Sequence, residues 1–251
     1  MQKKRKAQVT IFIVLGIIIV AGILIFFFTR QETAKKPEIA PNIQPIYSFV
    51  EECIQQIGTK SVYAVGKKGG YYKSPEISTK EGVPYFYYLG KNYMPEKQKV
   101  EQEISNYIKE KLPACINNFQ DFSDFNIEQK EINVEIKILE NKSIINVDYP
   151  ITIAKGVKIT SLEKFEDIEI PIRFGAIYDA VDNINQKQLN YTLACLSCFL
   201  NDSIEKDFYV SMEDYDEETV LVKIIDENTK INNQTFEFIY ANKFEPYTIE
   251  E

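Results

Sequence analysis

The residues of this chain with the most distinctive chemistry are its four cysteines, Cys53, Cys115, Cys195 and Cys198. In an oxidising compartment an even number of cysteines permits two disulfides, here with three connectivities. Cys53 and Cys115 each lie on the apolar stripe of a predicted helix, and two such helices can pack face to face. We therefore expect a Cys53–Cys115 disulfide. The alternative is that both remain reduced as small, buried apolar residues.

Cys195 and Cys198 form a Cys-x-x-Cys motif within the stretch LACLSCFL. At the start of a helix this motif supports disulfide exchange, because the helix dipole lowers the pKa of one thiol. The sequence places the motif late in a predicted helix, where the dipole raises that pKa, and among apolar residues that indicate burial. Reduced core cysteines and a local structural disulfide are therefore both favoured over a redox-active dithiol.

The usual motifs of hydrolases and nucleotide-binding proteins are missing from the sequence. There is no histidine, which removes the common general base of serine and cysteine hydrolases. Neither Gly-x-Ser-x-Gly nor Gly-x-x-x-x-Gly-Lys-Ser/Thr occurs. A zinc site of all four cysteines is disfavoured, because such sites use two closely spaced pairs and Cys53 and Cys115 are 62 positions apart. We predict no catalytic residue, no cofactor and no metal site.

Charge is distributed unevenly along the 251 residues. Five of the 29 lysines and arginines lie within the first thirty residues, where there is no acid. The remainder holds 24 basic and 37 acidic residues, a formal charge of −13. Phosphate backbones repel a body of this sign, so nucleic acid is excluded as a partner. Anionic lipid surfaces repel it too, which predicts a soluble domain held at a membrane by its tether.

An uncharged apolar segment, residues 9–28, follows the basic cluster KKRK. Its length makes a helix of about 30 Å, the thickness of a bilayer's hydrocarbon core. A cleaved secretory signal is shorter and ends in small residues, whereas this segment ends in three phenylalanines, so we expect it to be retained. The basic cluster places residues 1–8 in the cytoplasm. The prediction is a single-pass cell-membrane protein with an extracytoplasmic C-terminal domain.

The stretch KKRKAQVTIFIVLG resembles the N-termini of archaeal pilin-like proteins, whose class III signal segments carry basic residues, a small residue and Gln before the hydrophobic helix. The resemblance implies cleavage by a prepilin-type peptidase between Ala7 and Gln8. Pilins typically carry Glu at the fifth position after the cut, where it aids subunit assembly, and this chain has Phe12 there. A pilin-like subunit is therefore the second hypothesis, after a permanent anchor.

A segment with prolines at four-residue intervals, residues 29–45, follows the apolar segment. Proline removes a helical hydrogen bond and restricts the residue before it, so we expect the membrane helix to end near Arg30. The segment is predicted to be an extended spacer of about 45 Å at full stretch. In pilins the helix generally continues into the head as one rod, so this spacer also favours an anchor.

The rest of the chain, residues 46–251, is expected to form an extracytoplasmic α+β domain with about three helices and a mostly antiparallel sheet. A boundary within it is predicted near residues 125–130. Apolar spacing predicts helices over residues 46–64, from about 96, and from about 175 to 200, the last as one helix or as two pieces. We expect Pro113 to bend or end the second helix. Alternating patterns predict strands around residues 85–89, 132–153, 166–174 and 207–244.

Two groups of residues suggest surface roles. Four Asn-x-Ser/Thr sequons are candidate N-glycosylation sites: Asn141, Asn190, Asn201 and Asn233. Asn141 is the best of them, because it falls in the turn of a predicted hairpin. A dense aromatic region is explained mostly by packing, with a recognition surface for glycan or protein as the alternative: Tyr71, Tyr72, Tyr85, Tyr87, Tyr88 and Tyr93.

The phrases GGYY, VDYPITIAKG and FIYANKF, together with the N-terminus, are similar to an uncharacterised family of membrane-anchored proteins of small-genome archaea. That resemblance implies location and architecture and brings no activity. Our leading hypothesis is a membrane-anchored binding or structural protein of the cell envelope, with other envelope proteins or glycans as partners. A pilin-like subunit and a membrane-tethered thiol oxidoreductase using Cys195 and Cys198 are the alternatives.

Overall fold

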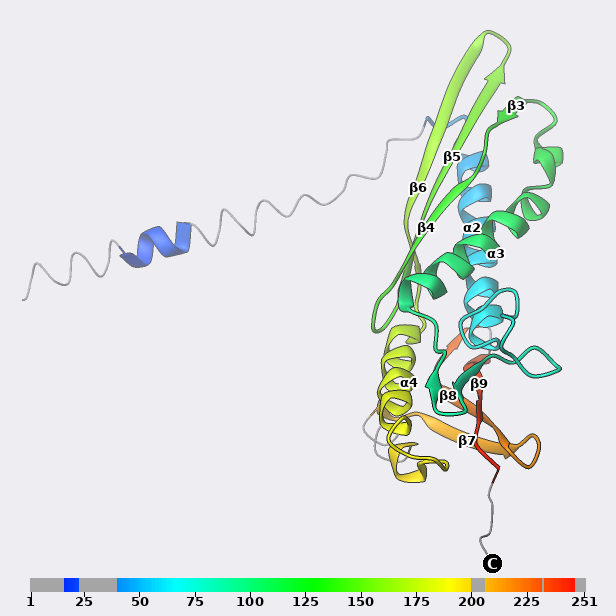
Figure 1. Cartoon of the computed structure of the whole chain (residues 1–251). Coiled ribbons are helices and arrows are strands. Elements are labelled where there is room, and N and C mark those ends of the chain that lie inside the picture. The colour runs from blue at the N-terminus through cyan, green and yellow to red at the C-terminus, as the bar shows by residue number, and fades with distance from the viewer. Residues whose placement is uncertain (1–15, 23–39, 200–205, 232, 247–251) are drawn as a thin grey trace, which may run out of the picture. The chain divides into compact units, whose positions relative to one another are not determined.

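The computed structural model describes residues 16–22, 40–199, 206–231 and 233–246 (Figure 1). Contacts divide the chain after Asn42, and residues 43–251 form one compact unit. This unit is an α+β domain, as the sequence predicts. The predicted internal boundary near residues 125–130 falls between the 3-10 helix η1 (Asn117–Phe122) and strand β3 (Asn126–Gln129) of this unit.

Two long helices, α2 (Gln44–Gly66) and α3 (Lys97–Ile116), pack side by side. Both carry apolar residues at helical spacing, and these are fully buried. In α3 they are Val100, Ile104, Ile108, Leu112 and Ile116. The Cys53–Cys115 disulfide joins α2 to the last turn of α3, in the pairing that the sequence predicts.

Two prolines lie inside helices, where the sequence predicts helix limits. Pro45 is expected to belong to the spacer, but α2 begins one residue before it. Proline is tolerated in a first turn because the N–H groups there have no intrahelical acceptor. Pro113 does not end the second helix either, since α3 continues to Ile116. The burial of Ile116 and the disulfide at Cys115 hold this last turn in place.

The first sheet contains β3, β4 (Asn133–Ile138), β5 (Ser143–Lys155) and β6 (Lys158–Ile170). Strand β5 is central, with β6 antiparallel to it on one side and β4 and β3 on the other. Alternate residues of β4 and β5 are buried, as their apolar–polar pattern predicts. Helices α2 and α3 pack on this sheet, and the long β5–β6 hairpin projects beyond them (Figure 1).

Helix α4 (Phe174–Gln188) follows the first sheet, and three strands after α4 join two strands that precede α3 in a second sheet. Its strand order is β2 (Lys91–Asn92), β1 (Tyr85–Tyr88), β9 (Gln234–Lys243), β8 (Thr219–Ile231) and β7 (Tyr209–Asp214). Every neighbouring pair is antiparallel except β1 with β9. The sequence predicts one sheet. The domain has two, because the C-terminal strands pair with β1, which precedes α3, and not with β6.

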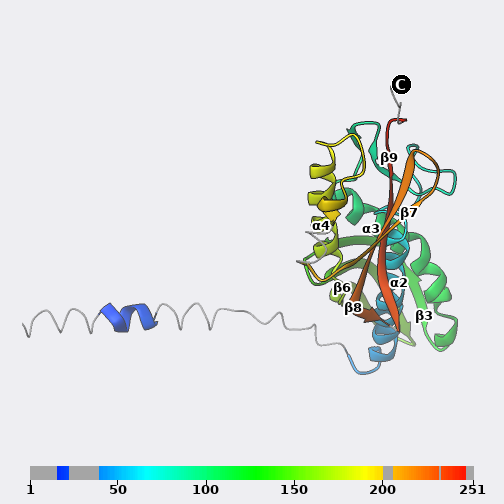
Figure 2. The ribbon, with the colours of Figure 1, turned by 90° about the horizontal axis from the view of Figure 1, so that it is seen from below.

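Aromatic rings fill the space between α4, the end of α2 and the second sheet. Phe86 stacks on Tyr240 with ring centroids 4.5 Å apart, and Phe174 lies 5.1 Å from Phe236. Tyr63 of α2 reaches the same cluster, 5.8 Å from Phe236. All but Tyr63 are completely buried. In Figure 2 the C-terminal strands lie in front of α2.

Helix α2 therefore packs against both sheets. Near its start, Tyr47 stacks on Phe165 of β6 with ring centroids 4.9 Å apart. Near its end, Gly66 lies so close to β9 that an added Cβ would be 2.6 Å from the Phe236 ring and 2.9 Å from the carbonyl oxygen of Glu237. Only glycine fits at this contact.

The predicted membrane helix, residues 9–28, lies mostly outside the described residues. Of this segment residues 16–22 are described, and they are helical. The basic segment 1–8 and most of the spacer also lie outside the described residues. Within the part of the chain that the structure describes, no helix has both the length and the hydropathy of a membrane span.

We predict that Gly66→Ala destabilises the domain. Alanine in place of glycine normally stabilises a helix by about 1 kcal/mol. Here the methyl group overlaps the Phe236 ring, and overpacking costs about 1–3 kcal/mol. Urea unfolding measures the change, with Ser48→Ala on the exposed face of α2 as the control. A gain in stability for Gly66→Ala would contradict the close packing of α2 on β9.

Candidate functional site

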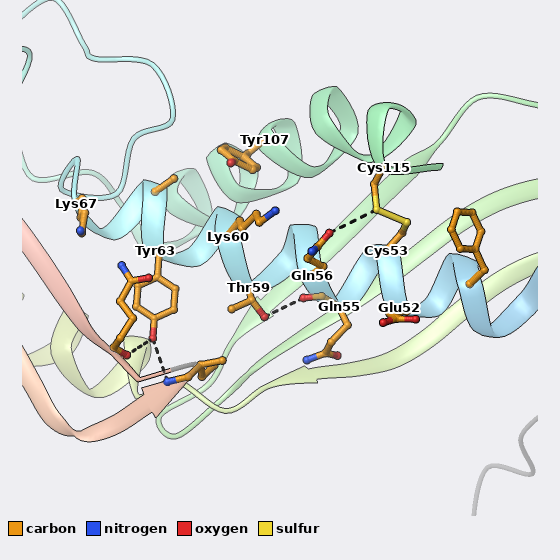
Figure 3. Close-up of a pocket in the computed structure, with 14 residues that line it drawn as sticks. Glu52, Cys53, Gln55, Gln56, Thr59, Lys60, Tyr63, Lys67, Tyr107 and Cys115 are labelled. Atoms are coloured by element: carbon orange, nitrogen blue, oxygen red, sulfur yellow. Dashed lines mark hydrogen bonds between the residues drawn. A yellow bond between two sulfur atoms is a disulfide. The ribbon is translucent and has the colours of Figure 1, made fainter. Parts of the chain in front are cut away.

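A groove runs along the face of α2 that neither sheet covers (Figure 3). We call it the α2 groove, and it encloses about 890 Å³. Tyr107 and Cys115 of α3 form one wall, and Ile231 and Gln234, at the turn between β8 and β9, form the opposite one. Its floor is made of polar α2 side chains, among them Glu52, Gln55, Gln56, Thr59 and Lys60.

The spacing of the polar residues in α2 explains the groove floor. Residues three and four positions apart share one face of a helix, so Glu52, Gln56 and Lys60 form a line. The apolar residues of α2 point into the core on the other side. The packing of α2 on two sheets therefore leaves its polar stripe facing solvent.

Tyr63 fixes one end of the α2 groove. Its hydroxyl donates to the carbonyl oxygen of Gln234 at 2.7 Å and accepts from the N–H of Ile231 at 3.3 Å. Burial raises the pKa of Tyr63, and the negative charge of Asp226 adds to the increase, while the Ile231 hydrogen bond opposes it. The phenol therefore stays protonated at neutral pH, and it ties α2 to the turn between β8 and β9.

The disulfide lies at the other end of the α2 groove. Cys53 and Cys115 have their Cα atoms 5.8 Å apart, and the Gln56 side-chain amide lies 3.7 Å from the Cys115 sulfur. Gln55 donates from its amide nitrogen to the carbonyl oxygen of Glu169 at 3.0 Å. The side chains of this part of the floor are therefore held in defined positions before any ligand arrives.

The composition of the α2 groove favours recognition over catalysis. Amides and a hydroxyl offer hydrogen bonds, Tyr107 and Phe49 offer ring faces, and Glu52 and Lys60 carry opposite charges. Such a mixture offers a ligand both hydrogen-bonding groups and ring surfaces. Among the described residues there is no cluster of three His, Cys, Asp or Glu side chains placed to hold a metal ion.

The structure places the Cys-x-x-Cys motif differently from the prediction. Helix α4 ends at Gln188, and a turn separates it from a new helical segment that begins at Leu196. Cys195 directly precedes this segment, so the motif lies at a helix start and not late in a helix. The sequence shows a continuous apolar pattern across this region, and the turn interrupts it. Cys195 and Cys198 form a disulfide.

Gln188 organises the turn that carries this second disulfide. Its side chain is completely buried, and its oxygen accepts from the N–H of Cys195 at 2.9 Å. Its nitrogen donates to the carbonyl oxygens of Tyr191 and Leu193 at 3.2 and 2.9 Å. Cys195 and Cys198 are only 5% and 6% exposed, which limits the approach of a partner thiol. These contacts favour a structural role for the second disulfide.

Of the candidate glycosylation residues, Asn141 and Asn190 do not line the α2 groove, whereas Asn233 lies between two residues that do, Ile231 and Gln234. Asn141 is exposed in the turn between β4 and β5, which confirms the predicted hairpin. Asn190 is exposed after α4, and Asn233 is exposed in the turn between β8 and β9. Glycosylation itself stays a prediction. Asn201, Ala7 and Gln8 lie outside the described residues.

The tyrosine-rich region serves mainly for packing. Tyr85 and Tyr87 are buried, and the others of the predicted group are partly buried. Tyr88 makes edge contacts with Tyr85 and Tyr93, at centroid distances of 5.1 and 6.1 Å. A pocket of about 240 Å³ lies beside Tyr71, Tyr85 and Tyr93.

The sequence interpretation missed the α2 groove, although one signal of it was present. The polar stripe of α2 recurs at helical spacing opposite the apolar stripe. The walls carry no such signal, because Ile231 and Gln234 are far from α2 in the sequence. Comparison with protein family models, with characterised proteins and with solved structures finds no match for this chain.

We predict that the two disulfides differ in their contribution to stability. The Cys53–Cys115 bridge closes a loop of 62 positions, and the Cys195–Cys198 bridge closes one of 3. Loop-closure entropy gives about 4 kcal/mol for the first and about 2 kcal/mol for the second. The double variants Cys53→Ser/Cys115→Ser and Cys195→Ser/Cys198→Ser, unfolded in urea without reductant, measure both. An equal or larger loss from the second pair would contradict this ranking.

Proposed function

We propose that this chain is a single-pass membrane protein whose α+β domain lies outside the cytoplasm and binds a polar ligand of the cell envelope in the α2 groove. The apolar segment 9–28 is its anchor, and the basic cluster before that segment keeps the N-terminus inside. No catalytic step is part of this proposal. The ligand class that suits the groove is a glycan.

The pairing of all four cysteines is the observation that carries the location. No free cysteine occurs in the chain, and both pairs have Cα distances suited to a disulfide, 5.8 and 5.4 Å. Disulfides persist in oxidising compartments and are rare in the cytosol. This agrees with the orientation that the basic cluster predicts.

Polar side chains held in fixed positions support the binding role. Gln55 and Tyr63 are oriented by hydrogen bonds to the backbone of β6 and of the β8–β9 turn. A site that is ordered before binding loses less entropy when the ligand arrives. Phe49 of α2 and Tyr107 of α3 both line the groove and offer rings for stacking on sugars.

Protease treatment of cells that express the full chain tests the location. We expect external protease to digest the domain after residue 40, with both disulfides present in the released peptides. Protection of the domain together with cytoplasmic markers would contradict the orientation. A mature N-terminus at Gln8 together with sheared filaments that contain the chain would instead establish the pilin-like alternative.

Substitutions in the α2 groove test the ligand class. We expect Gln56→Ala and Lys60→Ala each to weaken binding to glycans isolated from the native envelope by about fivefold, the effect of one lost hydrogen bond. Gln102→Ala is the matched control, because this exposed residue of α3 lies outside the α2 groove. Affinities measured by calorimetry decide the result. Equal affinities in all three variants would contradict a glycan site in the groove.

A further inference from the structure

The tip of the β5–β6 hairpin exposes large apolar side chains. Val157, in the turn, is fully exposed, and Ile159, at the start of β6, is 70% exposed. Most other exposed apolar residues of the domain lie at the turn after α4, which is at the other end of the domain (Figure 1). Apolar side chains at the end of a projecting hairpin are not buried in the core. Only a contact with another molecule or surface can remove them from water.

The charge of this tip is opposite to that of the rest of the chain. Residues 155–160 include Lys155 and Lys158 and no acid, whereas the chain after residue 30 has a formal charge of −13. The Asp124 carboxylate lies 3.7 Å from the Lys155 ammonium group, and both side chains are more than half exposed. Exposed pairs of this kind are weak. The tip therefore offers two lysines beside two aliphatic side chains.

The tip lies at the end of the domain where the chain enters from the proposed anchor. Helix α2 starts beside the middle of β6, because Tyr47 stacks on Phe165. From Phe165 the strand continues seven residues toward the tip, a distance of about 23 Å. Figure 1 shows the tip beyond the start of α2 and the strand β7 at the opposite end of the domain.

We propose that the β5–β6 tip docks on the surface of an anionic lipid bilayer, with Val157 and Ile159 inserted among the headgroups and Lys155 and Lys158 at the phosphates. The inference rests on the proposed membrane anchor. Residues 29–42 between the anchor and the domain can extend to about 43 Å, which exceeds the 23 Å from the start of α2 to the tip. The tether therefore permits this contact with the membrane that holds it.

Lipid is the occupant that the charges favour. The exposed apolar side chains that a second copy could offer, such as Leu193 and Leu196, lie at the turn after α4, at the end of the domain opposite the tip. An anionic bilayer offers phosphates and hydrocarbon together, on the side where the proposed anchor holds the tip. The acidic body is repelled by the same surface. Attraction of the tip and repulsion of the acidic body together orient the domain with its tip at the membrane. The CxxC end is then directed away from the membrane, and the α2 groove lies at a defined height above it.

A tryptophan at the tip tests the contact, because the natural chain contains none. The full chain with Val157→Trp is reconstituted in vesicles of phosphatidylcholine with or without phosphatidylglycerol, each containing brominated lipid as a quencher. We expect blue-shifted emission and strong quenching in the anionic vesicles. Both effects should be much weaker in neutral vesicles. The double substitution Lys155→Gln/Lys158→Gln in the same background should reduce the ratio of lipid-docked to undocked tips, as measured by quenching, by roughly fivefold per lysine.

Tyr209→Trp is the matched control, because Tyr209 is 58% exposed on β7 at the opposite end of the domain. Its emission should stay unquenched in both kinds of vesicle. Equal quenching of the two tryptophans, no quenching at position 157, or a blue shift without lipid quenching would each overturn the proposal. Retention of the chain in the vesicles after alkaline carbonate washing reports the anchor separately, so failure of the anchor and failure of the tip are distinguished.

Discussion

The packing of α2 on two sheets is the constraint on which the rest of the domain depends. Its first half contacts β6 through Tyr47 and Phe165, and its end contacts β9 so closely that Gly66 leaves no room for a side chain. A helix that is buried along two sheets has only one stripe left for solvent. That stripe is polar, and α3 and the turn between β8 and β9 flank it on its two sides. The α2 groove is thus a product of the same packing that forms the core.

The cysteines stabilise the two places where this packing is weakest. Cys115 holds the last turn of α3 to α2, beyond a proline that removes one helical hydrogen bond. Cys195 and Cys198 close a turn that exposes Leu193 and Leu196 and is otherwise tied to the domain by the buried amide of Gln188. Both disulfides therefore compensate for local losses of regular structure.

The two ends of the domain differ in charge and in surface chemistry. The hairpin tip beside the chain entry carries lysines and aliphatic side chains, and the opposite end carries the acidic turn between β7 and β8. With the proposed anchor in place, this distribution favours one orientation of the domain at an anionic surface. The α2 groove lies between the two ends, along the helix that begins at the tether. The α2 groove follows the helix with which the domain begins, and the hairpin tip lies beyond the start of that helix (Figure 1).

Much of the local structure was predictable from the sequence. Apolar spacing determined α2 and α3, and alternation determined the hairpin around Asn141 and the C-terminal strands. The pairing of Cys53 with Cys115 followed from their places on two apolar stripes. The apolar spacing and the alternation depend on residues a few positions apart, whose side chains share a face by geometry alone. The placement of Cys195 late in a helix was wrong, because a turn precedes it. At Pro113 the sequence left a bend or an end of the helix open, and the structure excludes the end. Distant contacts outweigh local preference at both places.

The sequence by itself therefore determined the elements, the charge distribution and the apolar N-terminal segment. Only the tertiary structure decided that the strands form two sheets, that β9 pairs with β1, and that the turn after β8 closes a groove on α2. The physical reason is that such pairings join residues more than a hundred positions apart. Their free energy comes from burial and hydrogen bonds that exist only once the chain is folded. No local sequence pattern therefore predicts these pairings.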